Sequence, residues 1–181
     1  MVILSDEQVF VSTTIDPYIT FVLSQNTISL TKAGGGNPDY QNTGFNNGTP
    51  NTLAVSTNAS SGYSISYIGS TLSADGGANT IDVMTTKTTS SPGTEQFGIN
   101  LRDNSTPDTG ADPSGGIGTP ASDYNTPDQF KFVTDVTTSL AFASGSSATT
   151  TFTISYIVNV SQTTEAGVYN TTITYIATGN F

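Results

Sequence analysis

The sequence predicts an all-β fold, a single antiparallel β-sandwich of the immunoglobulin-like or jelly-roll kind. Three observations predict it. Apolar residues alternate with Thr, Ser and Asn along short segments, turn residues separate many of these segments, and helical periodicity is essentially absent. A length of 181 residues is typical of one domain, so we expect residues 1–181 to form a single sandwich.

The strand pattern recurs along the whole chain, and turn residues such as Asp16-Pro17 and "SADGGAN" separate neighbouring segments. The expected strands, in chain order, are Gln8–Ile15, Tyr18–Ser24, Asn26–Thr31, Thr52–Thr57, Gly62–Ile68, Asn79–Thr85, Gln96–Leu101, Gln129–Thr134, Thr138–Ala143, Thr149–Val160 and Val168–Thr178.

The last two segments alternate most regularly. Side chains of a strand point alternately to the two faces of its sheet, so residues two apart share a face. We therefore expect the apolar phase of both segments to form the core between the sheets. The predicted core residues are Phe152, Ile154, Tyr156, Val158, Ile173 and Tyr175.

Two segments rich in Gly, Pro, Asn and Asp are predicted to be long loops, Lys32–Asn51 and Arg102–Asp128. Loops of this length are uncommon in compact domains and are often functional. The plainer interpretation is that they are surface excursions of one sandwich, and the sequence leaves both interpretations open.

Composition excludes several classes of function. The chain carries a net charge of −10 and has only four Lys and Arg residues, so it repels nucleic acid and offers it no basic patch. No apolar stretch is long enough for a transmembrane helix. Charged residues make up 10% of the chain, and Ser and Thr supply the remaining polarity, which predicts a hydroxyl-rich exterior.

The chain contains no His and no Cys, which excludes Ser-His-Asp and Cys-His catalysis and the zinc sites built from those residues. We expect no enzyme and no cofactor. The one candidate metal site lies in Arg102–Asp128, where Asp103, Asp108 and Asp112 could offer oxygen ligands to Ca²⁺. A solvated acidic loop is the alternative.

The N-terminal segment "SDEQVFVSTTIDP" is predicted to be extended, and it places Val9, Val11 and Ile15 on one face. Pro17 separates it from the next expected strand. Such a strand can pair within its own domain, or it can add to the sheet edge of a neighbour as an assembly strand. The sequence leaves both alternatives open.

The closing segment "TTEAGVYNTTITYIATGNF" leads from a small turn into an alternating Thr-rich strand. It resembles the closing strand of exported bacterial β-sandwich domains, namely spore-coat-U-type secreted pilus subunits and WxL-type cell-surface domains. "VSTTIDPYITFVLSQNTISL" resembles their opening strands, and "VSTNASSGYSISYIGSTL" resembles their middle hairpin. The resemblance implies an envelope or appendage protein that acts by packing and contact.

We therefore expect a non-catalytic, exported structural protein of the cell surface, a self-assembling subunit of a filament, coat or adhesive layer. Its expected partners are further copies of itself, other surface proteins or glycans. Its expected location is extracellular or on the cell surface, with any signal peptide absent from this chain. The alternatives are a carbohydrate- or cell-binding module that uses the long loops, and a viral capsid or spike jelly roll.

Overall fold

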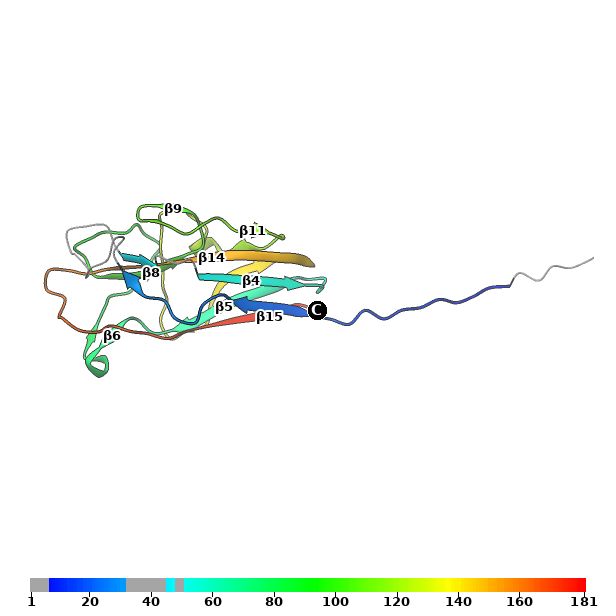
Figure 1. Cartoon of the computed structure of the whole chain (residues 1–181), viewed down its shortest axis with the longest axis horizontal. Helices are drawn as coiled ribbons and strands as arrows, with labels where there is room; N and C mark the ends of the chain where they lie inside the picture. Colours follow the sequence, from blue (N-terminus) through cyan, green and yellow to red (C-terminus); the bar gives the residue numbers. More distant parts are fainter. Residues whose placement is uncertain (1–6, 32–44, 48–50) are drawn as a thin grey trace, which may run out of the picture.

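The computed structural model describes residues 7–31, 45–47 and 51–181, with the side chains of all but residues 31 and 45–47. Antiparallel strands form two sheets that pack face to face around a shared apolar interior (Figure 1). This arrangement confirms the predicted all-β sandwich.

The first sheet is built on one long strand, β14 (Ser147–Asn159). Different strands pair with successive parts of each of its edges. β4 (Asn51–Thr57) and β3 (Phe45–Asn47) pair with successive parts of one edge of β14. β1 (Ile19–Leu23) pairs with the far side of β4, and β2 (Leu30–Thr31) pairs with the far side of β3. β11 (Ser114–Gly115) and β8 (Gln96–Asn100) pair with the other edge of β14. In this sheet β1 is an edge strand.

The second sheet has four strands, and β15 forms one of its edges. Their order is β12 (Thr119–Pro120), β13 (Thr138–Ala143), β5 (Tyr63–Gly69) and β15 (Ile173–Gly179). β15 pairs with β5 along its whole length, from Ile173 opposite Gly69 to Gly179 opposite Tyr63. Among the described residues, no strand pairs with its other edge.

The remaining elements are short and lie outside the two sheets. They are the pair β6 (Ser73–Ala74) and β7 (Asn79–Thr80), the pair β9 (Asn104–Ser105) and β10 (Asp108–Thr109), and the 3-10 turns η1 (Asp75–Gly77) and η2 (Ser122–Tyr124). The helical elements in the described ranges are thus single turns of three residues, and none could cross a bilayer.

The interior is a continuous apolar cluster of side chains from both sheets. From β14, the side chains of Phe152, Ile154, Tyr156 and Val158 are buried in it. Ile173 and Tyr175 of β15 pack against the same cluster but are only partly buried. The inner face of β15 is therefore covered less completely than the inner face of β14.

The opposite face of β14 is also buried, against the expectation of a hydroxyl-rich exterior there. Ile157 packs with Met84 and Phe130 in a second small cluster. Ser155 is fully buried, and its hydroxyl oxygen accepts a hydrogen bond from the Asn104 side chain at 3.1 Å. Segments outside the sheets thus cover this face, and one of them supplies a hydrogen bond to the buried Ser155 hydroxyl.

Several expected strands are shorter than predicted or absent. Gln8–Ile15 belongs to neither sheet, and Asn26–Thr31 contributes only its last two residues. Of Asn79–Thr85, only the first two residues form a strand, which is β7 in the separate pair with β6. Gln129–Thr134 makes isolated bridges through Phe130 and Lys131. Both Phe130 and Phe132 are nevertheless fully buried. The apolar pattern in this segment therefore indicates burial, although the segment forms no continuous ladder of strand hydrogen bonds.

Candidate functional site

The N-terminal segment, Glu7–Pro17, leaves the sandwich as an extended chain (Figure 1). It lies at the end of the molecule where the C-terminus also lies. Its large apolar side chains are almost fully exposed: Val9 86%, Phe10 90%, Val11 85% and Ile15 80%. Exposed apolar residues gathered on one segment mark an interaction site more often than a free surface.

Hydrogen bonds at the base of this segment fix where it leaves the body. The Asn58 side-chain amide donates to the Asp16 carbonyl and accepts from the Tyr18 backbone N–H, both at 2.8 Å. Thr57 Oγ1 donates to the Tyr18 carbonyl at 2.8 Å. Pro17 restricts its own φ and the conformation of Asp16. The anchoring therefore begins at Asp16, and residues 7–15 make no hydrogen bond to other described residues.

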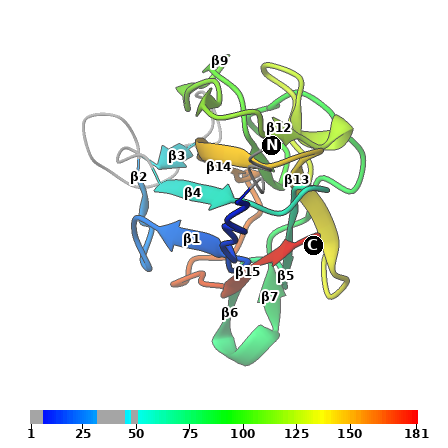
Figure 2. The same ribbon diagram turned by 90° about the vertical axis from the view of Figure 1, so that its right-hand side faces the viewer.

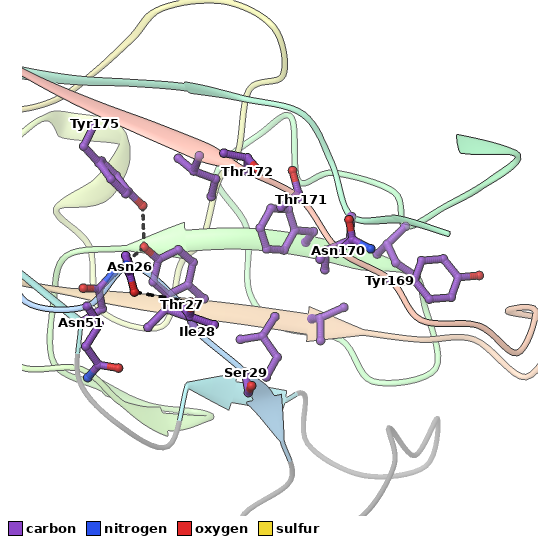
Figure 3. Close-up of a pocket in the computed structure, with 18 of the residues that line it drawn as sticks. Asn26, Thr27, Ile28, Ser29, Asn51, Tyr169, Asn170, Thr171, Thr172 and Tyr175 are labelled. Atoms are coloured by element: carbon purple, nitrogen blue, oxygen red, sulfur yellow. Dashed lines mark hydrogen bonds between the residues drawn. The ribbon is translucent and has the colours of Figure 1, made fainter. Parts of the chain in front are cut away.

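A cavity of about 660 Å³ opens at the side of the sandwich, and we call it the edge groove. One wall is Gln25–Leu30, the chain after β1, and the other is Gly167 and Tyr169–Ile173 with Tyr175. Tyr156 and Val158 of β14 lie between the walls. Figure 3 shows Asn26, Thr27, Ile28 and Ser29 on one side and Tyr169, Asn170, Thr171 and Thr172 on the other.

The groove lies between the edges of the two sheets. β1 and β15 contact each other near the end from which the N-terminal segment projects (Figure 2). Farther along, the chain after β1 and the chain before β15 separate and line the groove. The orange loop that joins β14 to β15 lies at the opposite end of the molecule from the N-terminal segment (Figure 1). The groove is thus displaced along the molecule from the base of that segment.

The lining residues that the structure describes include no charged side chain. This is notable in a chain with a net charge of −10. Ile28, Leu30, Val160, Tyr169 and Ile173 are partly buried residues that pack against the core from the groove. Neutral polar residues such as Asn26, Thr27 and Asn170 complete the lining, so the described part of the groove is an uncharged surface of mixed apolar and polar side chains on an acidic protein.

A chain of side-chain hydrogen bonds crosses the groove. Asn51 Nδ2 donates to the Tyr156 hydroxyl at 3.0 Å, and the hydroxyls of Tyr156 and Tyr175 lie 2.6 Å apart (Figure 3). Burial of the hydroxyl ends raises the pKa of both tyrosines above the ordinary value of 10, although Tyr175 as a whole residue is partly exposed. Both remain neutral near pH 7, and the hydrogen bond between them ties β15 to the first sheet.

The backbone groups of β15 alternate in direction. The Gly69 carbonyl accepts a hydrogen bond from Asp135 N–H at 2.8 Å, on the β13 side of β5. The backbone of Gly69 therefore points away from β15, and Gly69 with Ile173 is a pair that exchanges no hydrogen bonds. The next pair, Ile68 with Thr174, must then exchange them.

The other end of β15 gives the same alternation. Asn180 N–H donates to the Gly62 carbonyl at 2.8 Å, so the even-numbered residues face β5. The odd-numbered residues direct their N–H and C=O groups to the free edge, and among the described residues these groups have no partner. The free-edge residues of β15 are Ile173, Tyr175, Ala177 and Gly179.

The loop Arg102–Asp128 folds back on itself through carboxylates. Asp128 accepts hydrogen bonds from the backbone N–H of Thr106 and Ser105, both at 2.7 Å, and from Ser105 Oγ at 2.9 Å. The N–H of Thr106 is the main cause of a lowered pKa for the Asp128 carboxyl. The carboxylate thus acts as a structural acceptor inside the loop.

One carboxylate of the predicted calcium site, that of Asp112, has other partners. Asp112 accepts from the Asp103 backbone N–H at 3.1 Å and pairs with the Arg102 guanidinium at 2.8 Å, and these contacts lower its pKa. Asp103 and Asp108 are exposed. Within the described ranges, no group of three or more acidic side chains could hold a metal ion. The structure therefore does not bring Asp103, Asp108 and Asp112 together as ligands.

Comparison of the chain with family models, with curated proteins and with solved structures gives no match. The resemblance to secreted pilus subunits and cell-surface domains stays a prediction.

Sequence reasoning found the N-terminal segment but missed the groove. Asn26–Thr31 reads as a strand, and Ile28 reads as ordinary core. Tyr169 likewise reads as part of a closing strand that in fact begins at Ile173. The other predicted loop, Lys32–Asn51, lies mostly outside the described residues.

Proposed function

We propose that this chain is a non-catalytic structural protein that assembles with copies of itself into a linear polymer, a filament or coat at the cell surface. One observation carries the proposal: Glu7–Pro17 projects from the sandwich with Val9, Phe10, Val11 and Ile15 exposed. A contact between one end of a subunit and a different site on the next builds a fibre when it does not close into a ring.

Charge supports this assignment over binding of polyanions. Residues 8–15, "QVFVSTTI", carry no charge, whereas the whole chain carries −10. The long-range field of the body opposes close approach of two copies, so association requires uncharged contact surfaces. Residues 8–15 of the N-terminal segment are such a surface.

Electron microscopy and size-exclusion chromatography across a concentration series test the proposal on the full-length chain. The wild type should form regular polymers, and Val11→Asp should remain monomeric because a carboxylate would be buried in the contact. Ser12→Asp adds the same charge at the neighbouring residue and should still assemble. A wild-type chain that stays monomeric at the highest concentrations would refute the proposal and favour a binding module.

A further inference from the structure

We propose that the edge groove is the acceptor site for the N-terminal segment of a second copy of this chain, which enters as an additional strand antiparallel to β15. The inference rests on the proposed function, because it names the contact that joins one subunit to the next. Four independent features of the chain support it.

The first feature is the incomplete inner face of β15. Ile65 and Tyr67 of the neighbouring strand β5 are fully buried, whereas Ile173 and Tyr175 opposite this strand are only partly buried. All four side chains belong to the same interior cluster. Apolar surface that remains in contact with water at the edge of a core favours a further covering element. One added strand beside β15 would supply that cover.

The second feature is the backbone. The free edge of β15 presents the N–H and C=O groups of Ile173, Tyr175 and Ala177, and residues 7–15 form no hydrogen bond to other described residues. Unpaired strand edges accept further strands, and strand addition provides main-chain hydrogen bonds. Each backbone therefore has unpaired N–H and C=O groups that could pair with those of the other.

The third feature is the chemical match of the surfaces. The described lining of the groove has no charged residue, and Gln8–Ile15 is uncharged. Within that segment, Val9, Val11 and Ile15 share one phase of an extended chain, while Phe10 falls on the other. An uncharged strand with apolar residues on one face thus meets an uncharged groove whose lining is partly apolar.

The fourth feature is the placement of the two sites along the molecule. β15 runs toward the end from which the N-terminal segment projects, and the segment itself runs from its distant N-terminus back to its own body (Figure 1). In a head-to-tail array, successive copies share one orientation. The donated segment then runs opposite to β15, which gives antiparallel pairing.

The backbone alternation also fixes the phase of the pairing. In an antiparallel pair, residues directly opposite each other exchange hydrogen bonds at alternate positions and share a face of the sheet. Ile173 and Tyr175 offer their backbone to the edge and turn their side chains inward. Donor residues opposite them must do the same, so Val9, Val11 and Ile15 enter the sandwich and Phe10 and Ser12 face outward.

Cross-linking between full-length chains tests this contact, and the absence of native Cys leaves no background reaction. One chain carries Val11→Cys, and a second chain with a distinguishable mass tag carries either Ile173→Cys or Ala177→Cys. Oxidation of the mixture should give a cross-linked heterodimer with at least one of the two acceptors. The matched donor Ser12→Cys should give little product, because its side chain points out of the groove.

Failure of the contact and failure of the polymer can be told apart. Regular filaments without any cross-link from position 11 to position 173 or 177 would overturn the groove as acceptor and leave the proposed function standing. Cross-linked pairs without filaments would support the groove and overturn the polymer. Equal cross-linking from positions 11 and 12 would overturn the proposed phase.

A peptide measurement gives a second route that does not depend on polymerisation. The receptor is the full-length Val11→Asp chain, and the probe is a labelled peptide of residues 7–17. Binding should weaken about tenfold or more when the peptide carries Val11→Asp. The peptide with Ser12→Asp should bind within about twofold of the wild-type peptide. Absence of measurable binding by the wild-type peptide would overturn the acceptor site.

Discussion

Two strands carry almost the same four residues and differ in how completely the fold covers them. β14 contains "ISYI" at Ile154–Ile157, and β15 contains "ITYI" at Ile173–Ile176. Ile154 is fully buried, whereas Ile173 is only partly buried. β14 has strands on both edges, whereas the described residues place a strand on only one edge of β15.

The difference shows that a strand pattern specifies which face turns inward but not how far that face is covered. "ISYI" also occurs in β5 at Ile65–Ile68, and there too Ile65 and Tyr67 are fully buried. β5 lies between β13 and β15. The incomplete cover of β15 therefore follows from its position at the edge and leaves room for one more strand.

The largest expected effect comes from truncating equivalent isoleucines of the two strands. Ile154→Ala should lower the free energy of unfolding by about 2–5 kcal/mol, the usual range for a fully buried site. Ile173→Ala should lower it clearly less in a chain kept unassembled by Val11→Asp, because its side chain is already partly hydrated. Chemical denaturation of both variants measures the difference. Equal losses would mean that the inner face of β15 is covered in the single chain.

Removal of one hydroxyl across the groove should have a smaller effect. Tyr175→Phe deletes the 2.6 Å hydrogen bond to the Tyr156 hydroxyl and should lower the free energy of unfolding by about 1 kcal/mol. The matched control is Tyr169→Phe, whose hydroxyl donates to the Glu165 carbonyl at an exposed site. That control should stay within about 0.5 kcal/mol of the wild type. Both values come from the same denaturation series.

Deletion of residues 1–15 should leave the stability of the sandwich almost unchanged. Residues 7–15 form no hydrogen bond to other described residues, so the free energy of unfolding should change by less than about 0.5 kcal/mol. The same deletion should abolish polymers. Thermal denaturation and electron microscopy report the two effects separately. A truncated chain that unfolds would show that this segment belongs to its own domain.

The smallest expected effect is local and depends on pH. The pKa of Asp128 is lowered in the folded chain from its ordinary value of 3.8, mainly by the Thr106 N–H. Its contribution to loop stability is therefore present above the ordinary pKa and is lost as pH falls through the lowered folded value. Proteolysis of Arg102–Asp128 by an acid-active protease should accelerate below about pH 3.8. Asp128→Asn should weaken this pH dependence and leave β15 unaffected.

The sequence was sufficient to predict the sandwich and much of its core. The alternation of Phe152, Ile154, Tyr156 and Val158 depends only on local geometry, and a buried face needs apolar residues at every second position. The same reasoning located the exposed Val9, Val11 and Ile15 on one phase of an extended segment. These properties are local, so a single sequence can reveal them.

The edge groove could not be predicted because it depends on contacts between distant segments. Ile28 and Tyr169 meet at one cavity only after β1 and β15 have taken their places in different sheets. The buried outer face of β14 was missed for the same reason, since Met84 and Phe130 reach Ile157 from separate parts of the chain. The alternation of apolar and polar residues indicates to which face of the sheet a side chain points. It does not indicate which segments of the chain cover that face.

Residue-resolved hydrogen exchange on β15 tests the central claim most directly. In the unassembled Val11→Asp chain, the amides of Thr174 and Ile176 should be protected by β5, and those of Ile173, Tyr175 and Ala177 should exchange rapidly. Addition of the peptide of residues 7–17 should slow exchange at the three odd-numbered amides and leave the two even-numbered ones unchanged. Odd-numbered amides that are already protected, or that the peptide does not slow, would contradict the account.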